Sequence, residues 1–377
     1  MNKLKIATLL CWIVLLLLSL EVIIPYKNAS SSDLIYIESI YQDIFIRNYP
    51  IHGWLVSKAP YFFPDWMLYF IIRLFINNYT SAWYIYTFLN LIIIILIFNY
   101  SLKIIYNQIS INTTIFSFIW GALLLTFVFS TPNGLDSHTF LYPVYHSGAL
   151  LNGLLIMLCW LSCNNNNSNS IKIFNFIISI LATMSDLWFV LWFVIPIFVS
   201  STFLVYTKKI NLKCSLSFNL IMITGVLFGE LLNRLIESSG LLYYSQIPVG
   251  TPAYTFINQL NHFFKDLLDL FINSPVLFTL FIINIIISIF SIIICIDGKL
   301  FEKTANKINS YMNSNINLNL LISLNVLSIV TFIIPLIPII YLKMWEQWNY
   351  RYIHHFIVLP WLLIGIYLYG LIWRSIK

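Results

Sequence analysis

The sequence has few charged residues. Asp, Glu, Lys and Arg make up 9% of its 377 residues, whereas 60% are hydrophobic. A soluble domain contains about 25% charged residues, and a folded chain with so few would expose large apolar patches to water. This shortage excludes a soluble enzyme, a nucleic-acid-binding protein and a disordered chain. It predicts an all-α integral membrane protein whose main partner is the lipid bilayer, with no nucleic-acid partner.

Cysteine and metal-binding motifs are also scarce. The five cysteines include no CxxC pair, and all fall in helix halves or loops that we place on the cytoplasmic side, where disulfides are rare. Asp136, His138 and His146 lie close together in sequence, but their spacing matches no strong metal site. We therefore expect no cofactor and no bound metal, with a divalent ion left as an alternative.

Long hydrophobic runs dominate the chain. A helix that crosses a bilayer needs about 20 mostly apolar residues, and runs such as LIIIILIF lack the alternation of barrel strands. Gly225 and Gly229 form a small-xxx-small face that predicts close helix packing. The short segment 171–184 has a re-entrant hairpin as its alternative. About 10 transmembrane helices are predicted in a single domain, 1–377, at 6–24, 82–99, 113–130, 144–161, 171–184, 187–206, 215–235, 275–296, 318–342 and 353–373.

Lys and Arg are concentrated in alternate loops, which sets the orientation. With the N-terminus in the cytoplasm beside Lys3, the lysine-containing loop 297–317 is cytoplasmic and so are both termini. Residues 25–81 and 236–274 then form the two large outer loops. The formal net charge of +6 thus reflects topology. We expect a multi-pass protein of the bacterial inner membrane.

The first outer loop predicts two amphipathic surface helices. Residues 32–47 follow a serine run that can cap a helix, and their apolar residues recur at helical spacing. This pattern is typical of a helix lying on the membrane. Residues 63–75 begin with Phe-Pro-Asp-Trp and are too short to span, which indicates a second surface or re-entrant helix.

Carboxylates and a histidine near the outer surface are candidate catalytic or binding groups, because charge at membrane depth is costly and usually functional. Asp33 is a candidate general base, with a helix-dipole partner as the alternative. Glu38 is a second catalytic candidate, or part of a solvated face. His146 can act as acid, base or phosphate partner. Asp186 is a candidate ligand for substrate or an N-cap, and Asp65 is predicted to cap the second surface helix.

Cationic residues near the outer helix ends are candidate phosphate ligands. Arg234 follows Glu230 by four residues, so it either forms a structural ion pair or binds an anionic head group. Lys343, Arg351 and His354 lie in KMWEQWNYRYIHH. The aromatics there fit an ordinary interface belt, but the cations can also bind a phosphate.

Several of these pieces together resemble the GT-C superfamily of polytopic membrane glycosyltransferases. The matching segments are SSDLIYIES, FFPDWMLYF, YHSGALLNG, MSDLWF and RYIHH. The resemblance implies transfer of a sugar from a polyprenyl-phosphate-linked donor to a lipid or glycan acceptor at the outer face, in cell-envelope polysaccharide synthesis. It also implies that Asp33 is the base and that Arg351 and Arg234 hold the lipid phosphate. The first loop lacks the Asp-x-Asp or Glu-x-Asp pair.

Three other functions fit the same composition. An O-antigen-type polymerase or ligase would depend on outer arginines such as Arg47 and Arg73. A transporter or flippase predicts ionisable residues at mid-membrane and paired broken helices. A membrane acyltransferase would use His146 with Asn152.

Overall fold

The computed structural model describes most of the chain, and that part is mostly helical. The description covers 32–57, 59–107, 111–129, 146–165, 168–245, 275–297, 317–341, 354–373 and a few isolated positions. The elements are α2 (Ser32–Tyr41), η2 (Gln42–Ile46), β1 (Trp54–Val56), η3 (Phe62–Trp66), α3 (Met67–Phe75), α4 (Tyr79–Tyr106), α5 (Ile111–Phe129), α6 (Ser147–Asn165), α7 (Asn169–Ser185), η5 (Val190–Val194), α8 (Ile195–Tyr206), α9 (Leu212–Ser238), β2 (Leu242–Tyr244), α11 (Pro275–Ile296), α13 (Leu318–Tyr341), α15 (His354–Leu368) and η7 (Tyr369–Trp373).

Four helices are long and apolar enough to cross a membrane. They are α4, α6, α9 and residues 318–336 of α13. The other predicted spans that fall within the described residues coincide with shorter apolar helices: α5, α7, η5 with α8, α11, and α15 with η7. The membrane character follows from these helices. The prediction of ten spans remains a prediction, and its first segment, 6–24, lies outside the described residues.

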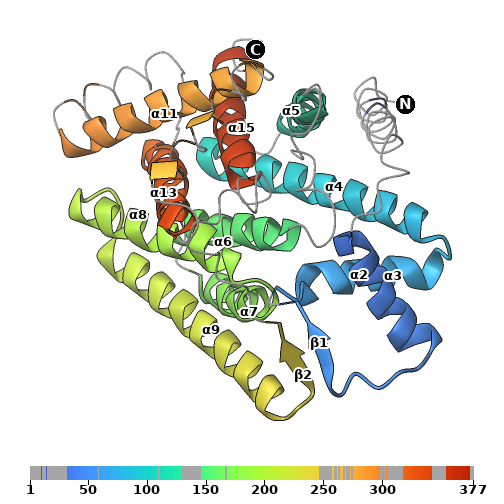
Figure 1. The fold of residues 1–377 in the computed structure, drawn as a ribbon. Coiled ribbons are helices and arrows are strands. Elements are labelled where there is room, and N and C mark those ends of the chain that lie inside the picture. Colours follow the sequence, from blue (N-terminus) through green and yellow to red (C-terminus); the bar gives the residue numbers. More distant parts are fainter. Residues whose placement is uncertain are drawn as a thin grey trace.

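Helix α6 occupies the centre of the bundle, between α4, α7 and η5 (Figure 1). It is the most buried of the four candidate spans. Its sequence explains this position, because Gly148 and Gly153 let neighbouring elements approach closely. Trp160 and Leu154 are fully buried farther along the helix.

Helices α7 and α9 pack closely, as the glycine spacing predicts. A Cβ atom at Gly229 would lie 2.7 Å from the backbone oxygen of Ile180, and one at Gly225 would lie 2.7 Å from the Cβ of Ser179. Only glycine leaves room for such contacts with backbone and Cβ atoms. In lipid, close packing of this kind is a principal source of helix association.

Contacts between segments that are distant in sequence join some of the helix ends. At one end, strands β1 and β2 pair in parallel and join the first predicted outer loop to the second. They lie side by side at the edge of the molecule in Figure 1. At the other end, the Asn317 backbone N–H donates to the Ile105 carbonyl at 2.9 Å. The sequence did not predict the strands, and the assignment of loops to the two membrane faces remains a prediction.

The first loop folds against the bundle. The predicted surface helices at 32–47 and 63–75 appear as α2 with η2 and as η3 with α3. Buried side chains of both pack with the beginning of α4 in a separate apolar cluster that contains Ile37, Trp66, Tyr69 and Tyr86. In Figure 1, α2 and α3 lie under one end of α4. This packing brings first-loop polar residues to the ends of the spanning helices.

Candidate functional site

The turn Tyr61–Trp66 is anchored on the ends of α6 and α7. The Phe63 N–H donates to the Ser185 hydroxyl at 2.6 Å, and the Tyr61 N–H donates to the Ser185 carbonyl at 3.1 Å. On the α6 side, the Asn152 amide donates to the Phe63 carbonyl at 3.2 Å. Three backbone groups of the turn are thus held by two helices, which fixes the position of Asp65.

Asp65 is fully buried between this turn and the bundle. Its Oδ1 accepts a hydrogen bond from the Tyr86 hydroxyl of α4 and another, at 3.2 Å, from the Ser147 hydroxyl of α6. A Cβ atom at Gly148 would lie 2.9 Å from Asp65 Oδ2, so the glycine makes room for the carboxylate. The prediction that Asp65 caps the second surface helix is therefore wrong, because its carboxylate instead accepts these long-range hydrogen bonds.

His146 and Asp186 form a second polar pair next to Ser147. His146 Nδ1 lies 2.5 Å from Asp186 Oδ2, and both side chains are almost completely buried. The other Asp186 oxygen accepts a bond from the Trp188 N–H at 3.0 Å, so the predicted N-cap is confirmed. Asp186 therefore caps the helix turn and orients the imidazole at the same time.

The backbone and the surrounding rings also fix His146. Its φ of 62° is left-handed, a conformation that is uncommon for residues other than glycine and often associated with functional sites. The rings of Tyr61, Trp188 and Trp192 meet the imidazole edge-on, with centroids 5.6–6.1 Å away. An Nδ1–H held by a carboxylate leaves Nε2 as the basic nitrogen of the ring. Such a His–Asp pair can move a proton to or from a hydroxyl group.

Glu38 lies in a separate cluster on the first-loop helices. Arg73 donates to its two oxygens from Nε at 2.9 Å and from Nη2 at 2.8 Å, and the Tyr69 hydroxyl donates at 2.7 Å. Burial disfavours the charged form, but the bonds from Arg73, Gln42 and Tyr69 outweigh it and lower the pKa of Glu38. A carboxylate held ionised in an ion pair is better suited to joining α2 to α3 than to accepting a proton.

The predicted cationic ligands do not gather at one point among the described residues. Arg234 bonds Glu230 at 3.1 Å and its side chain is 75% exposed, which confirms the ion pair. Lys343 and Arg351 lie outside the described residues. His354 begins α15 and Asp33 stands in the first turn of α2, and the structure describes the side chain of neither.

Within the described residues, no group of three or more His, Cys, Asp or Glu side chains could hold a metal ion. The Asp136 and His138 positions lie outside that part of the chain. The site is therefore best described by its hydrogen-bonded groups: the carboxylate of Asp65 with two hydroxyls, and the His146–Asp186 pair. We call these residues, with Tyr86 and Ser147, the buried polar cluster.

Comparisons with known protein families, with curated proteins and with solved structures found no match. The buried polar cluster is therefore the main indication of function. Of its members, the sequence identified His146 and Asp186 as candidate site residues but did not identify Tyr86 or Ser147, and it interpreted Asp65 as a helix cap. The available signal was weak: a carboxylate in an apolar Pro-Asp-Trp context that is too hydrophobic for an exposed cap.

Proposed function

We propose that the chain is a membrane glycosyltransferase that transfers a sugar from a polyprenyl-phosphate-linked donor to a lipid or glycan acceptor at the outer membrane face. The observation that carries the proposal is the docking of the first-loop turn Tyr61–Trp66 on α6 and α7, which buries Asp65 beside the His146–Asp186 pair. A carboxylate, hydroxyls and a histidine are thereby gathered at one end of the spanning helices, where a lipid-linked substrate presents its polar head.

Sugar transfer needs a base for the acceptor hydroxyl and stabilisation of the departing phosphate. We assign the base to Asp33, as the resemblance implies, or to His146, whose imidazole is oriented by Asp186. Helix α2 supports the first assignment, because it carries Asp33 one turn before Ile37, which packs with Trp66 of the docked turn. Arg351 is assigned to the phosphate on the resemblance alone. The resemblance implies the same role for Arg234, but the ion pair of Arg234 with Glu230 argues against it.

An O-antigen-type polymerase or ligase is less well supported. It would depend on outer arginines that bind an anionic substrate. Arg47 bonds Asp43, Arg73 bonds Glu38 and Arg234 bonds Glu230. Each of these cations already has a carboxylate of its own chain as partner, which leaves less charge for a substrate.

A membrane acyltransferase is the second candidate function. The specific observation in its favour is the short Nδ1–Oδ2 distance between His146 and Asp186, the arrangement by which a carboxylate orients a histidine base. In that reaction His146 takes the proton of the acceptor hydroxyl as the hydroxyl oxygen forms an ester bond to the acyl carbon. The bond from that carbon to the thiol or alcohol of the acyl donor breaks, and the leaving group takes up the proton. The two candidates differ in the group transferred, so the mass of the product distinguishes them.

The test uses a strain in which the gene is deleted and then restored as wild type or as a variant. Lipid-linked saccharides and surface glycans are extracted and analysed by mass spectrometry. Deletion should remove one hexose or pentose unit from a product and accumulate a polyprenyl-phosphate-linked donor. Asp186→Asn should reproduce the deletion at normal protein level in the membrane.

Two matched variants make the test specific. Asp33→Asn removes the assigned base, whereas Asp43→Asn removes a first-loop carboxylate that pairs with Arg47 near the surface. Loss of product with Asp33→Asn but not with Asp43→Asn supports sugar transfer with Asp33 as base. Loss of an acyl group in place of a sugar would assign the chain to the second candidate, and an unchanged glycan and lipid profile on deletion would refute both.

A further inference from the structure

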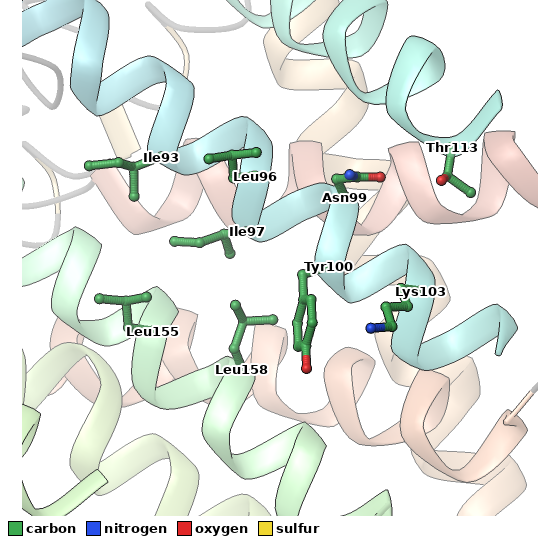
Figure 2. A pocket seen from close by; sticks show the side chains of 9 residues that line it. All are labelled: Ile93, Leu96, Ile97, Asn99, Tyr100, Lys103, Thr113, Leu155 and Leu158. Carbon is green, nitrogen blue, oxygen red and sulfur yellow. The ribbon is translucent and has the colours of Figure 1, made fainter. Parts of the chain in front are cut away.

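A groove runs along the half of α4 that is remote from the buried polar cluster. It has a volume of about 480 Å³ and lies between α4, α5 and α6, within the range of small-molecule sites. Figure 2 shows Ile97 and Tyr100 pointing from α4 toward Leu155 and Leu158 of α6. Leu96 is 51% exposed and Tyr100 is 44% exposed, so the groove opens onto the side of the bundle that faces lipid.

The length of the groove matches one leaflet of a bilayer. Its lining on α4 runs from Ile93 to Lys103, and ten helical residues cover roughly 15 Å at 1.5 Å per residue. The hydrocarbon core of a membrane is about 30 Å thick. The lining is aliphatic over most of this length, so the groove is long enough and apolar enough for a single acyl chain.

The end of the groove is cationic and polar. Lys103 is in the last turn of α4, and its ammonium group lies 5.0 Å from the centre of the Tyr100 ring. In Figure 2 the ammonium group turns toward Tyr100, and Asn99 and Thr113 bring polar atoms to the same end. No ion pair of Lys103 occurs among the described residues. A lone cation at a membrane boundary attracts an anionic lipid head.

We infer that this groove is a binding site for an anionic phospholipid. One acyl chain lies along Ile97, Leu155 and Leu158, and the head-group phosphate lies against Lys103 with Asn99 as a neighbouring donor. The site is in the leaflet opposite the buried polar cluster, and it does not depend on the proposed transferase activity. It requires only that α4 crosses the bilayer.

The experiment is native mass spectrometry of the purified full-length protein titrated with phosphatidylglycerol and, separately, with phosphatidylcholine. The apparent Kd of the first bound lipid is measured for each. Wild type should bind phosphatidylglycerol more tightly. Lys103→Gln should weaken phosphatidylglycerol binding about fivefold, the effect of one basic residue near the membrane surface, and leave phosphatidylcholine unchanged. Lys103→Arg should keep the preference.

Matched controls separate the groove from the general surface. Lys213→Gln removes an exposed lysine of α9, and Leu216→Trp enlarges an exposed leucine of the same helix; both should bind lipid like wild type. Leu158→Trp fills the groove and should weaken both lipids several-fold. The inference would be overturned if Lys103→Gln and Lys213→Gln had equal effects, or if wild type showed no preference for phosphatidylglycerol. Both of these tests can be made even if Leu158→Trp fails to fold.

Discussion

The ion pair of Arg73 and Glu38 allows a sharp test of how the first loop is held. Arg73 makes two bonds to Glu38, and its Nη1 donates to the Ile76 carbonyl at 2.5 Å. The guanidinium also lies 4.7 Å from the centre of the Tyr41 ring. The perturbation is Arg73→Met, which keeps an unbranched apolar stem and removes the charge and the donors.

The expected loss is about 3 kcal/mol. Breaking a buried ion pair from one side costs about 3–5 kcal/mol, and the lower end applies because Glu38 keeps its bonds from Tyr69 and Gln42. Hydrogen exchange reports the free energy of local opening. A loss of this size should accelerate exchange of α2 and α3 amides on the order of 100-fold.

The assay is hydrogen–deuterium exchange with mass spectrometry on the protein in lipid nanodiscs. Arg47→Met is the matched control, since its pair with Asp43 is exposed on the arginine side and such pairs contribute less than about 1 kcal/mol. The double variant Glu38→Leu/Arg73→Met should exchange more slowly than Arg73→Met alone, because no charge is left buried. If Arg73→Met and Arg47→Met accelerate exchange equally, the buried pair does not hold the loop.

Two further predictions concern helix packing and pH. Gly229→Leu should lower the thermal unfolding temperature in detergent, because the leucine side chain would overlap the backbone of α7 and overpacking costs about 1–3 kcal/mol. The control Leu227→Met, on the exposed side of α9, should leave the unfolding temperature unchanged. The pKa of Glu38 is below its ordinary value, so its ion pair stabilises the loop at neutral pH and this stability is lost as pH falls through the lowered pKa. Exchange of α2 amides, corrected for intrinsic rates, should accelerate only in acid, and Glu38→Gln should remove that dependence; acceleration near neutral pH would contradict the assignment.

Much of the helical architecture could be predicted because it depends on residues that are close together in the sequence. The low charge and long apolar runs identify a membrane protein, and the helices follow from those runs. The Gly225–Gly229 spacing predicts the contact with α7 because small residues four apart share one helix face. Asp186 could be predicted as an N-cap for the same reason, since capping involves only the next few residues.

The buried polar cluster could not be predicted because its contacts are long-range. Asp65 meets Ser147 across 82 residues, and His146 meets Asp186 across 40. The first pair depends on the first loop folding back over helix ends, and the second depends on α6 packing beside α7. Helical periodicity carries no information about either step. The pairing of β1 with β2 is similar, since each strand has only three residues and gains its partner only when two distant loops meet.

We propose that the buried polar cluster lies at a site of sugar transfer from a lipid carrier. The most direct measurement is release of polyprenyl phosphate by the purified protein in proteoliposomes, using lipid-linked saccharides extracted from the deletion strain as donor and acceptor. The account predicts release coupled to a product heavier by one sugar, abolished by Asp186→Asn and retained by Asp43→Asn. Release at the wild-type rate by the Asp186→Asn protein, or no release by wild type from any fraction of the extract, would contradict it.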